Sequence, residues 1–533
     1  MKKLLLLVAS ASLLCFQSQF KAQAPVLGTT SNFALFSTNG AVTNTGMSII
    51  TGDVGTNNGA ATNFGNVNGV MHDADGTTAI AAAALTIAYN QLNAAIPNFF
   101  PAPLLGNGQT LTAGTYSIGQ SATLNNTLTL DGGGNPNSVF IFQIGGAFSS
   151  GANAQVLLTN GALACNVFWK VEGLVDLATN TAMKGTVVAN NAAIILNTGV
   201  TLEGRALSTT GAITVAGVTI AKPIGCGSVI LTGPLAPNLR SVVCYTVFSG
   251  NGAVTNSGIS FITGDVGTNL GLTTGFQAEN VIGTIHASPD VSTAICAADL
   301  NTVYNYLNTL PTDIELLYPA AFGNNLVLTP HTYQMNAATV VNGKVFLNAQ
   351  NNPDAVFVIK INGALSTTTY AEVVLQNGAQ AKNVFWKVDG AINLNDYANF
   401  KGTVIGNNGA VIINTGVTIE GRVLSTSGAV ATFGISAQMT PGCSALSTNG
   451  ATVKNNAAKF YPNPFSTVLN VAIDNLDGGS TLTIYNAAGS KVIEKVLTGT
   501  VTTLQFKVPA GIYYYQLLSK NGAKQSGKLI SKP

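Results

Sequence analysis

The stretch Lys184–Ser208, KGTVVANNAAIILNTGVTLEGRALS, decides the fold of this chain. Residues 185–201 align with residues 203–219 at a spacing of 18, and in both units short runs of Val, Ile, Leu and Thr alternate with Gly and Asn. Three short strands separated by turn residues fit one such unit. The pattern is typical of a β-helix, whose coils stack about 4.8 Å apart. An antiparallel sandwich is the alternative, although it does not require this register.

The same stretch occurs a second time. Lys401–Ser425 reads KGTVIGNNGAVIINTGVTIEGRVLS, and 401 − 184 gives an offset of 217. The hexapeptide NVFWKV of Asn166–Val171 returns at Asn383–Val388, and TGDVGT of Thr51–Thr56 returns at Thr263–Thr268. A whole domain of about 200 residues is therefore duplicated, which differs from a solenoid of short repeats.

One segment in each copy interrupts the strand pattern. Residues 77–95 (TTAIAAAALTIAYNQLNAA) contain no Gly and end before Pro97. The counterpart begins at Ser288, which we expect to be the N-cap residue with Pro289 in the first turn, and it ends at Leu310. We expect both segments to be helices that lie along the flank of each β-helix.

Composition excludes several classes of protein. Only 8% of the residues are charged, against about 25% in ordinary soluble proteins, while 46% are hydrophobic and the net charge is +2. No apolar run beyond the N-terminal segment is long enough to span a membrane. The hydrophobic content argues against disorder, and the near-zero net charge argues against nucleic-acid binding.

The ends of the chain differ from its middle. Met1-Lys2-Lys3 and the apolar run that follows, with Ala22-Gln23-Ala24 behind it, predict a signal peptide. Nine of the 23 Lys and Arg residues lie after residue 450, where short strand-like runs predict a small β-sandwich. The expected segments are a signal peptide at 1–24, β-helix copy one at 25–226, a linker at 227–240, β-helix copy two at 241–443, a linker at 444–454, and a C-terminal domain at 455–533.

Five cysteines remain after the signal peptide, an odd number for an exported chain. We expect disulfides between Cys165 and Cys226 and between Cys244 and Cys296. The cysteines form no cluster with histidine, so the sequence predicts no zinc site and no other metal or cofactor.

Candidate catalytic groups are sparse. His72 and His286 occupy equivalent places before the helices, where capping or packing is the expected role, and His331 is expected to be a surface turn residue. Paired carboxylates would be needed to cleave a polysaccharide, and the acidic residues lie beside glycine at coil corners, where we expect them to stabilise turns. These carboxylates are Asp53, Asp265, Glu172, Asp389, Glu203 and Glu420. The sequence thus predicts no enzyme, with a polysaccharide-cleaving enzyme as the remote alternative.

The outward residues of the coils are Thr, Ser, Asn, Ala and Gly. A flat, rigid and nearly uncharged face suits a partner that is itself periodic and uncharged, such as the ordered water of ice. The alternative is that these residues simply suit β corners.

Several motifs resemble the microbial ice-binding proteins. They are Asn32–Phe36 (NFALF), Gly52-Asp53-Val54-Gly55, the flanking helix, Val139–Ile144 (VFIFQI) and Asn166–Val171. The resemblance implies an all-β dominated fold of two discontinuous right-handed β-helices (β-solenoids), each with one flanking α-helix. It also implies binding to the ice crystal surface through one flat face near a Thr-Ala/Gly-x-Thr/Asn stretch.

Residues 60–63 (AATN) and 272–275 (LTTG) are the counterparts of that stretch, and the other expected positions follow by alternation. The expected ice-binding residues are Thr62, Asn63, Ser121, Thr123, Asn190, Ala192, Ser208, Thr210, Thr273, Thr274, Asn407, Ser425 and Ser427. Because Leu272 interrupts copy two, we expect copy one to retain most of the activity. A cell-surface adhesin or structural module without ice activity is the alternative function.

The tail resembles a sorting domain of the type IX secretion system. Phe460–Phe465 (FYPNPF), Gly511–Tyr515 (GIYYY) and Gly527–Ile530 (GKLI) carry this resemblance. It implies contact with the secretion machinery and a secreted or surface-attached, extracellular protein.

Overall fold

The computed structural model describes residues 22–227, 230–443, 458–473, 479–486, 489–519 and 524–532. The chain divides into two compact units, Met1–Gly442 and Cys443–Pro533. Most of the expected signal peptide and all of the linker expected at 444–454 lie outside the described residues.

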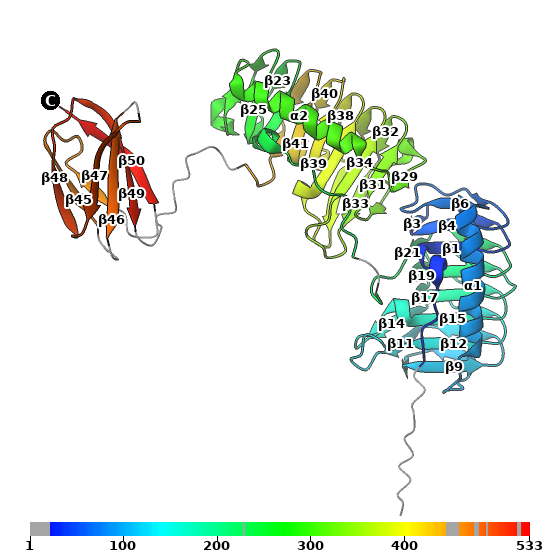
Figure 1. The fold of residues 1–533 in the computed structure, drawn as a ribbon. Coiled ribbons are helices and arrows are strands. Elements are labelled where there is room, and N and C mark those ends of the chain that lie inside the picture. The colour runs from blue at the N-terminus through cyan, green and yellow to red at the C-terminus, as the bar shows by residue number, and fades with distance from the viewer. Residues whose placement is uncertain are drawn as a thin grey trace, which may run out of the picture. The chain divides into compact units, whose positions relative to one another are not determined.

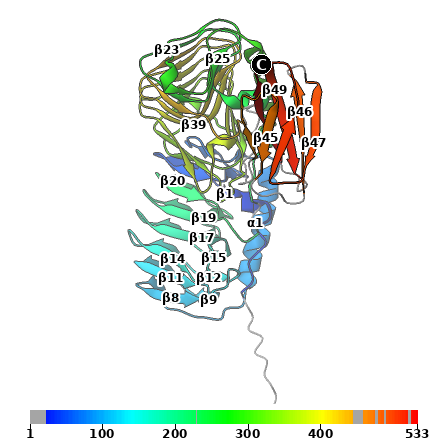
Figure 2. The same ribbon diagram turned by 90° about the vertical axis from the view of Figure 1, so that its left-hand side faces the viewer.

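Copy one is a three-sided β-helix of parallel strands, as expected (Figures 1 and 2). Within residues 22–227 a 13-stranded sheet and a separate eight-stranded sheet enclose one apolar core. The eight-stranded sheet, called the flat sheet of copy one below, comprises β2 Val42–Thr45, β5 Ala61–Thr62, β7 Leu104–Gly106, β10 Ala122–Asn125, β13 Phe148–Ser150, β16 Val175–Leu177, β18 Ile194–Leu196 and β20 Ile213–Ala216. The other sheet comprises β1 Phe33–Ser37, β3 Ile49–Thr51, β4 Asp53–Thr56, β6 Met71–Asp73, β8 Gln109–Thr112, β9 Gly114–Ile118, β11 Thr127–Asp131, β12 Phe140–Ile144, β14 Gln155–Thr159, β15 Val167–Val171, β17 Ala182–Ala189, β19 Thr201–Ser208 and β21 Thr219–Ala221.

The order of the coils is discontinuous. Strand β1 pairs with β19 on one side and with β4 on the other, so the first coil of the chain lies beside the last coil of the copy. Helix α1, Gly76–Ala94, packs along the flank against β12 and β15 on its way to the far end (Figure 2). The expected fold class is confirmed.

The coil period differs by one residue from the sequence estimate. Gly185 pairs with Gly204 and Ile194 pairs with Ile213, so the spacing is 204 − 185 = 19. The alignment at 18 placed Ile195 over Ile213, whereas Ile195 pairs with Thr214. Since neighbouring residues of a strand point to opposite faces, this slip exchanges the inward and outward side chains of the flat sheet.

Copy two repeats the arrangement within residues 230–443, with α2 Val291–Thr309 along its flank (Figure 1). Its seven-stranded sheet, the flat sheet of copy two, comprises β23 Val254–Ser257, β26 Thr273–Thr274, β32 Thr339–Val341, β35 Leu365–Thr367, β38 Ile392–Leu394, β40 Val411–Ile413 and β42 Val430–Phe433. Its 15-stranded sheet comprises β22 Tyr245–Ser249, β24 Phe261–Thr263, β25 Asp265–Thr268, β27 Val281–Ile282, β28 Ile285–His286, β29 Ile314–Glu315, β30 Leu326–Leu328, β31 Thr332–Met335, β33 Lys344–Asn348, β34 Phe357–Ile361, β36 Glu372–Gln376, β37 Val384–Val388, β39 Asn399–Gly406, β41 Thr418–Ser425 and β43 Ser436–Gln438.

Each helix begins at an aspartate that caps its first turn. Asp75 accepts a hydrogen bond from the backbone N–H of Thr78 at 2.9 Å, and Asp290 accepts one from Thr293 at 2.9 Å. The expectation that Ser288 is the cap was wrong, because Asp290 forms a reciprocal capping box with Thr293.

The second unit is the expected small sandwich. In its described residues, antiparallel strands form a three-stranded and a four-stranded sheet around a separate core that includes Phe465 and Leu482. The strands are β44 Lys459–Tyr461, β45 Val468–Ala472, β46 Ser480–Asn486, β47 Lys491–Leu497, β48 Val501–Gln505, β49 Gly511–Ser519 and β50 Lys524–Ser531.

One of the two expected disulfides is present. Cys165 and Cys226 are bonded, with a Cα–Cα distance of 6.0 Å. The pairing of Cys244 with Cys296 was wrong: Cys244 is disulfide-bonded, whereas Cys296 is a free, buried thiol of α2. Burial raises the pKa of the Cys296 thiol.

The two copies contact each other directly within the first unit. Asn66 accepts a hydrogen bond from the backbone N–H of Tyr318 at 2.9 Å, and the buried hydroxyl of Tyr333 donates to Asn68 at 2.7 Å. His331, expected at the surface, is half-buried here and contacts the Thr329 hydroxyl at 3.2 Å. Desolvation lowers the pKa of His331.

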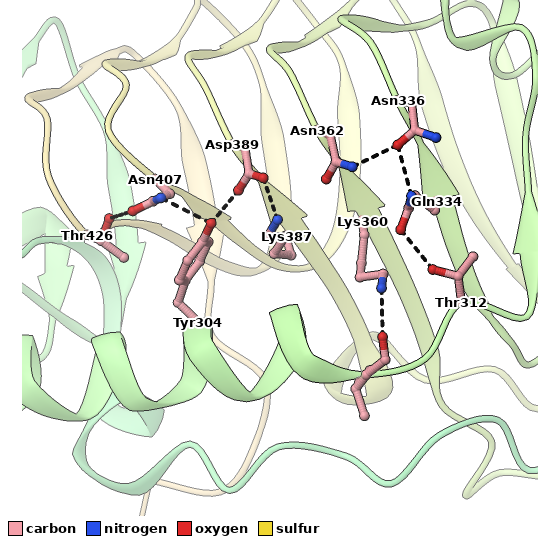
Figure 3. A network of polar contacts seen from close by, with 11 residues as sticks. Tyr304, Thr312, Gln334, Asn336, Lys360, Asn362, Lys387, Asp389, Asn407 and Thr426 are labelled. Atoms are coloured by element: carbon pink, nitrogen blue, oxygen red, sulfur yellow. Dashed lines mark hydrogen bonds and ion pairs between the residues drawn. The ribbon is translucent and has the colours of Figure 1, made fainter.

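A polar network fastens α2 to the coil corners of copy two (Figure 3). The Tyr304 hydroxyl donates to Asp389, which also pairs with Lys387 at 2.5 Å. Asn407 donates to the Tyr304 oxygen at 3.0 Å and accepts from the Thr426 hydroxyl at 2.6 Å. Desolvation and the neighbouring Asp389 raise the pKa of Tyr304, so the phenol stays protonated and remains a donor.

Copy one has the same network with glutamate in place of aspartate. Tyr89 donates to Glu172 at 2.7 Å, and Asn190 donates to Glu172 at 2.7 Å and accepts from Thr209 at 2.9 Å. Burial and the hydrogen bond to Glu172 raise the pKa of Tyr89 to about 12. Burial opposes ionisation of Glu172, but bonds from Lys170, Asn190 and Tyr89 outweigh it and lower the pKa of Glu172. The contribution of Glu172 to stability is therefore present above its unfolded pKa and is lost as the pH falls through its folded pKa.

Removing either phenol hydroxyl should destabilise the copy that carries it. Tyr89→Phe and Tyr304→Phe each leave a carboxylate without one donor, which costs about 1–2 kcal/mol. For a domain of roughly 200 residues this lowers the unfolding temperature by about 2–4 °C per kcal/mol. Differential scanning calorimetry of the full chain measures the change, and Thr129→Val, on an outward position of β11, is the control. Unchanged transitions in both tyrosine variants would contradict the fastening role.

Candidate functional site

Outward side chains of the flat sheets form continuous rows across the strands. Thr43 of β2 pairs with Thr62 of β5 and with Thr214 of β20, and the same register continues to the far end of the copy. We call this set the second row; none of its members is buried. In copy one it consists of Thr62, Thr43, Thr214, Ile195, Asp176, Ser149, Thr123 and Leu104, and in copy two of Thr274, Thr255, Ala431, Ile412, Asn393, Ser366 and Val340.

A second set of outward residues, parallel to the second row, lies at the N-terminal ends of the strands of the flat sheets. Each of its residues directly precedes the first residue of a strand of the flat sheet. The backbone carbonyl of each accepts a hydrogen bond from a backbone N–H of the neighbouring coil at 2.8–3.0 Å. We call this set the first row; none of its members is buried. It consists of Ala60, Ala41, Ala212, Ala193, Leu174 and Ala147 in copy one and of Leu272, Ala253, Ala429, Ala410, Ala391 and Ala364 in copy two.

The two rows together form a grid of mostly small side chains, in which Ile195 and Ile412 occupy matched places of the second row. Adjacent members of one row are separated by the spacing between strands, about 4.8 Å, and the rows are separated by two residues, roughly 6.6–6.8 Å along a strand. The tyrosine networks lie immediately beside this grid, because Asp389 precedes Ala391 by two residues and Asn407 precedes Ala410 by three. Fastening the corners fixes where the first row begins in each coil.

The grid carries little charge. Among the residues of both rows, Asp176 is the one ionisable side chain, and its carboxylate accepts a hydrogen bond from Asn197 at 2.8 Å. Asn393 occupies the matching place in copy two, where Asn414 donates to it at 2.7 Å. The grid of copy two is therefore neutral.

Bulky side chains interrupt the first row at different places in the two copies. Leu174 is 41% exposed between Ala193 and Ala147, in the interior of the row, whereas Leu272 is 58% exposed at its outer end. Ala391 takes the interior place in copy two. The uninterrupted part of the first row is longer in copy two.

Five of the predicted residues lie on or beside the grid. Thr62, Thr123 and Thr274 belong to the second row. Ser121 directly precedes β10, and its hydroxyl accepts from the Ala147 backbone N–H at 3.0 Å. Asn63 is exposed at the corner that follows β5, with φ of 65°.

The remaining predicted residues lie at or near corners, and several are removed from solvent. Ser208 and Ser425 are buried and donate to the carbonyls of Ala192 and Gly409, so neither can meet an external surface. Thr273 is also buried, and its hydroxyl has no hydrogen-bond partner. These three predictions were wrong.

Asn190 and Asn407 are engaged by the tyrosine networks, and Ala192 packs partly against the core. Thr210 and Ser427 lie in the turns that follow β19 and β41. Residues such as Thr43, Thr214 and Ala431 were missed because the alternation was counted from the wrong corner. A spacing of 19 residues, as between Gly185 and Gly204, places Thr214 beside Ile195 and Ala431 beside Ile412.

The candidate catalytic groups have structural roles. His72 and His286 bond the capping aspartates at 2.6 Å, which confirms a role at the start of each helix. Asp53 and Asp265 accept hydrogen bonds from the backbone N–H groups of Val70 and Thr284 at 2.9 and 2.7 Å. Because these donors lie in the neighbouring coil, the expected carboxylate-to-backbone bonds join two coils and do not close a local turn.

Glu203 and Glu420 also join coils, through ion pairs, instead of stabilising turns. Glu203 pairs with Lys184 at 2.7 Å and Glu420 with Lys401 at 3.2 Å, in each case across the β17/β19 or β39/β41 register. Among the described residues, no three His, Cys, Asp or Glu side chains are grouped so as to hold a metal ion. Nor does any helix in the described ranges have the length and apolarity needed to cross a bilayer.

Comparison with known proteins agrees with this geometry. The family model described as "Ice-binding-like" matches residues 36–221 and 248–435, and the model described as "Secretion system C-terminal sorting domain" matches residues 459–532. An ice-binding protein of Nostoc sp. (strain HG1) is 39% identical over 218 residues, which are 40% of this chain and 80% of the relative. An ice-binding protein of Colwellia sp. is 31% identical over 196 residues, 34% of this chain and 76% of the relative.

Both copies together also match one solved structure. The crystal structure of an ice binding protein from an Antarctic bacterium Flavobacteriaceae is 77% identical, with a TM-score of 0.79 over 79% of this chain and all of that chain. Since the family model covers most of both β-helices, and both are built on the same three-sided coil, this chain belongs to the ice-binding-like family.

Proposed function

We propose that this chain is an exported ice-binding protein that adsorbs to ice through the first and second rows of its flat sheets and inhibits ice growth or recrystallisation. The observation that carries the proposal is the continuous register of the second row, which extends over eight strands in copy one and seven in copy two. We further propose that the chain has no catalytic activity and needs no cofactor.

The physical argument rests on periodicity and rigidity. Ice presents an uncharged lattice, and adsorption to it is the sum of many weak contacts. These contacts contribute net binding free energy only if the spacing of the protein groups is fixed before binding. Alanine and threonine methyl groups are apolar, while threonine and serine hydroxyls can hold ordered water. Backbone hydrogen bonds between the coils fix the grid, so little conformational entropy is lost on adsorption.

The C-terminal unit supports delivery to the outside of the cell. A sorting domain directs its cargo to the secretion machinery, so the protein is secreted or attached to the cell surface, in an extracellular location.

The structure leads us to propose that copy two contributes more than copy one. Asp176 places a charge in the second row of copy one, and Leu174 projects from the interior of its first row. Copy two has Asn393 and Ala391 at these places, and its Leu272 lies at the end of the row. The sequence of residues 60–63 led to the opposite expectation, that copy one retains most of the activity. We give more importance to the two complete rows than to this one stretch of four residues.

Bulky substitutions in the second row should separate the copies. Thr214→Tyr and Ala431→Tyr change matched positions, 217 residues apart, and each places a ring above a flat surface. We expect Ala431→Tyr to remove more than half of the thermal hysteresis of the full chain and Thr214→Tyr to remove less. Nanolitre osmometry and recrystallisation assays on the purified chain measure both effects.

The matched control is Thr129→Tyr, on the outward side of β11, outside the flat sheet. The equivalent position in copy two already holds Phe346, so a ring is tolerated there. Round, unshaped ice crystals at high concentrations of the unmodified chain would overturn the proposed function. Binding to cells or glycans without any ice affinity would then favour the adhesin alternative.

Removing residues 455–533 should leave both β-helices folded while stopping export. The two units have separate cores, so neither needs the other to fold. We expect the truncated chain to accumulate in the periplasm with unchanged thermal transitions of the β-helices, as measured by cell fractionation and calorimetry. Normal surface delivery of the truncated chain would refute the sorting role.

A further inference from the structure

Two exposed tyrosines occupy a corner where the rest of the chain uses asparagine or glycine. Tyr370 follows β35 and Tyr397 follows β38, with φ of 59° and 60°. Their counterparts in copy one, 217 residues earlier, are Asn153 and Asn180, with φ of 60° and 61°. The backbone is thus the same in both copies, and only the side chains differ.

This backbone conformation disfavours tyrosine. A positive φ is tolerated by glycine and asparagine, whereas a bulky side chain there is a strained outlier that costs free energy. In copy one the asparagines also form a ladder along the corner, where Asn180 donates to Asn153 at 3.3 Å. Copy two lacks that ladder and carries the strain at two successive coils, which contacts of the two rings have to offset.

The two rings are held in place, not free. Their centroids are 5.1 Å apart with an angle of 11° between the planes, so they stack along the axis of the β-helix. The Tyr397 ring lies against Gly416 of the next coil, where an added Cβ would come within 2.4 Å of the ring. Yet Tyr370 is 70% exposed and Tyr397 is 51% exposed.

The coil that precedes the Tyr370 coil in the chain is shorter at this corner. The coil below turns this corner with residues 342–343, whereas the Tyr370 coil uses residues 368–371, two residues more. The shorter corner contains Gly343, around which a Cβ would meet nothing within 4 Å. The Tyr370 side chain is therefore largely open to solvent, and Gly343 places no side chain at the same corner of the preceding coil.

The surroundings of the rings favour a neutral ligand. The nearby Asp396 accepts a hydrogen bond from the Thr415 backbone N–H at 3.1 Å, and Glu372 pairs with Lys344 at 2.8 Å. Both carboxylates are thus already engaged. Thr369, the residue before Tyr370 in the chain, is exposed and carries a hydroxyl.

We propose that Tyr370 and Tyr397 form a binding subsite for a neutral pyranose ring of an extracellular polysaccharide. An aromatic face with a polar rim suits a ligand that presents C–H groups on one side and hydroxyls at its edge. A ring-sized contact also suits a sugar better than a protein, since a stable protein interface needs about 20–30 residues on each side. The subsite lies outside both rows and does not depend on ice binding.

The test compares the full chain with its Tyr370→Asn/Tyr397→Asn variant, which installs the residues of copy one. The probes are hexasaccharides of β-1,4-, β-1,3- and α-1,4-linked glucose, titrated to about 10 mM because a single ring contact gives millimolar affinity. We expect the full chain to bind at least one probe, and the asparagine variant to bind it at least tenfold more weakly. Calorimetry should show that the variant unfolds at the same or a higher temperature, and its thermal hysteresis should be unchanged.

Tyr370→Phe/Tyr397→Phe is the matched control, because it keeps both rings and removes only the hydroxyls. Its affinity should stay within a few-fold of the unmodified chain. Equal affinities of the full chain and the asparagine variant, or no binding to any probe, would overturn the proposal. A change in self-association of the asparagine variant, seen by sedimentation velocity without any change in sugar binding, would assign the rings to a contact between chains and would also overturn it.

Discussion

Backbone hydrogen bonds between parallel coils are the interaction on which the rest of the molecule depends. In the β17/β19 ladder eight successive residues pair, from Ala182 with Thr201 to Ala189 with Ser208. This register fixes which side chains point inward to the core and which point outward, since a slip of one residue exchanges the two sets. The rows of the flat sheets therefore follow from the coil length more than from any single side chain. A grid fixed by the backbone keeps the same register from strand to strand in each copy.

The few charges of the chain are placed where they hold coils together. Lys170 and Lys387 are buried and pair with Glu172 and Asp389 at the corners. Arg422 is fully buried and donates to the Val243 carbonyl and to Thr440, and burial lowers its pKa to about 10. Buried charges are tolerated because each has hydrogen-bond partners in the coils around it. This use of charge in the structure leaves the outward rows almost neutral.

The sequence alone predicted the architecture, but it did not predict which residues form the first and second rows. The duplication, both helices and the sandwich could be predicted, because repeated motifs and turn residues are local signals. Cysteine pairing is not a local signal, and one of the two expected disulfides was wrong. The outward residues of the flat sheets can be identified only when the pairing register of the strands is known. Alternation counted from the wrong corner gave Ser208 and Ser425, which are buried. The tyrosine networks were missed because their partners, such as Tyr304 and Asp389, are 85 residues apart and meet only after α2 packs on the coils.

The discontinuous order of the coils has a consequence for how the chain is made and moved. Strand β1 finds one of its two neighbours, β19, only after about 170 further residues have been synthesised. Contacts so distant in sequence form slowly, because the long loop between them must first be closed. The end of copy one that receives copy two, at Asn66 and Asn68, is built on these same early coils. Each copy therefore completes its fold late in synthesis. Until nearly the whole copy has been made, the chain remains unfolded enough to pass through a membrane.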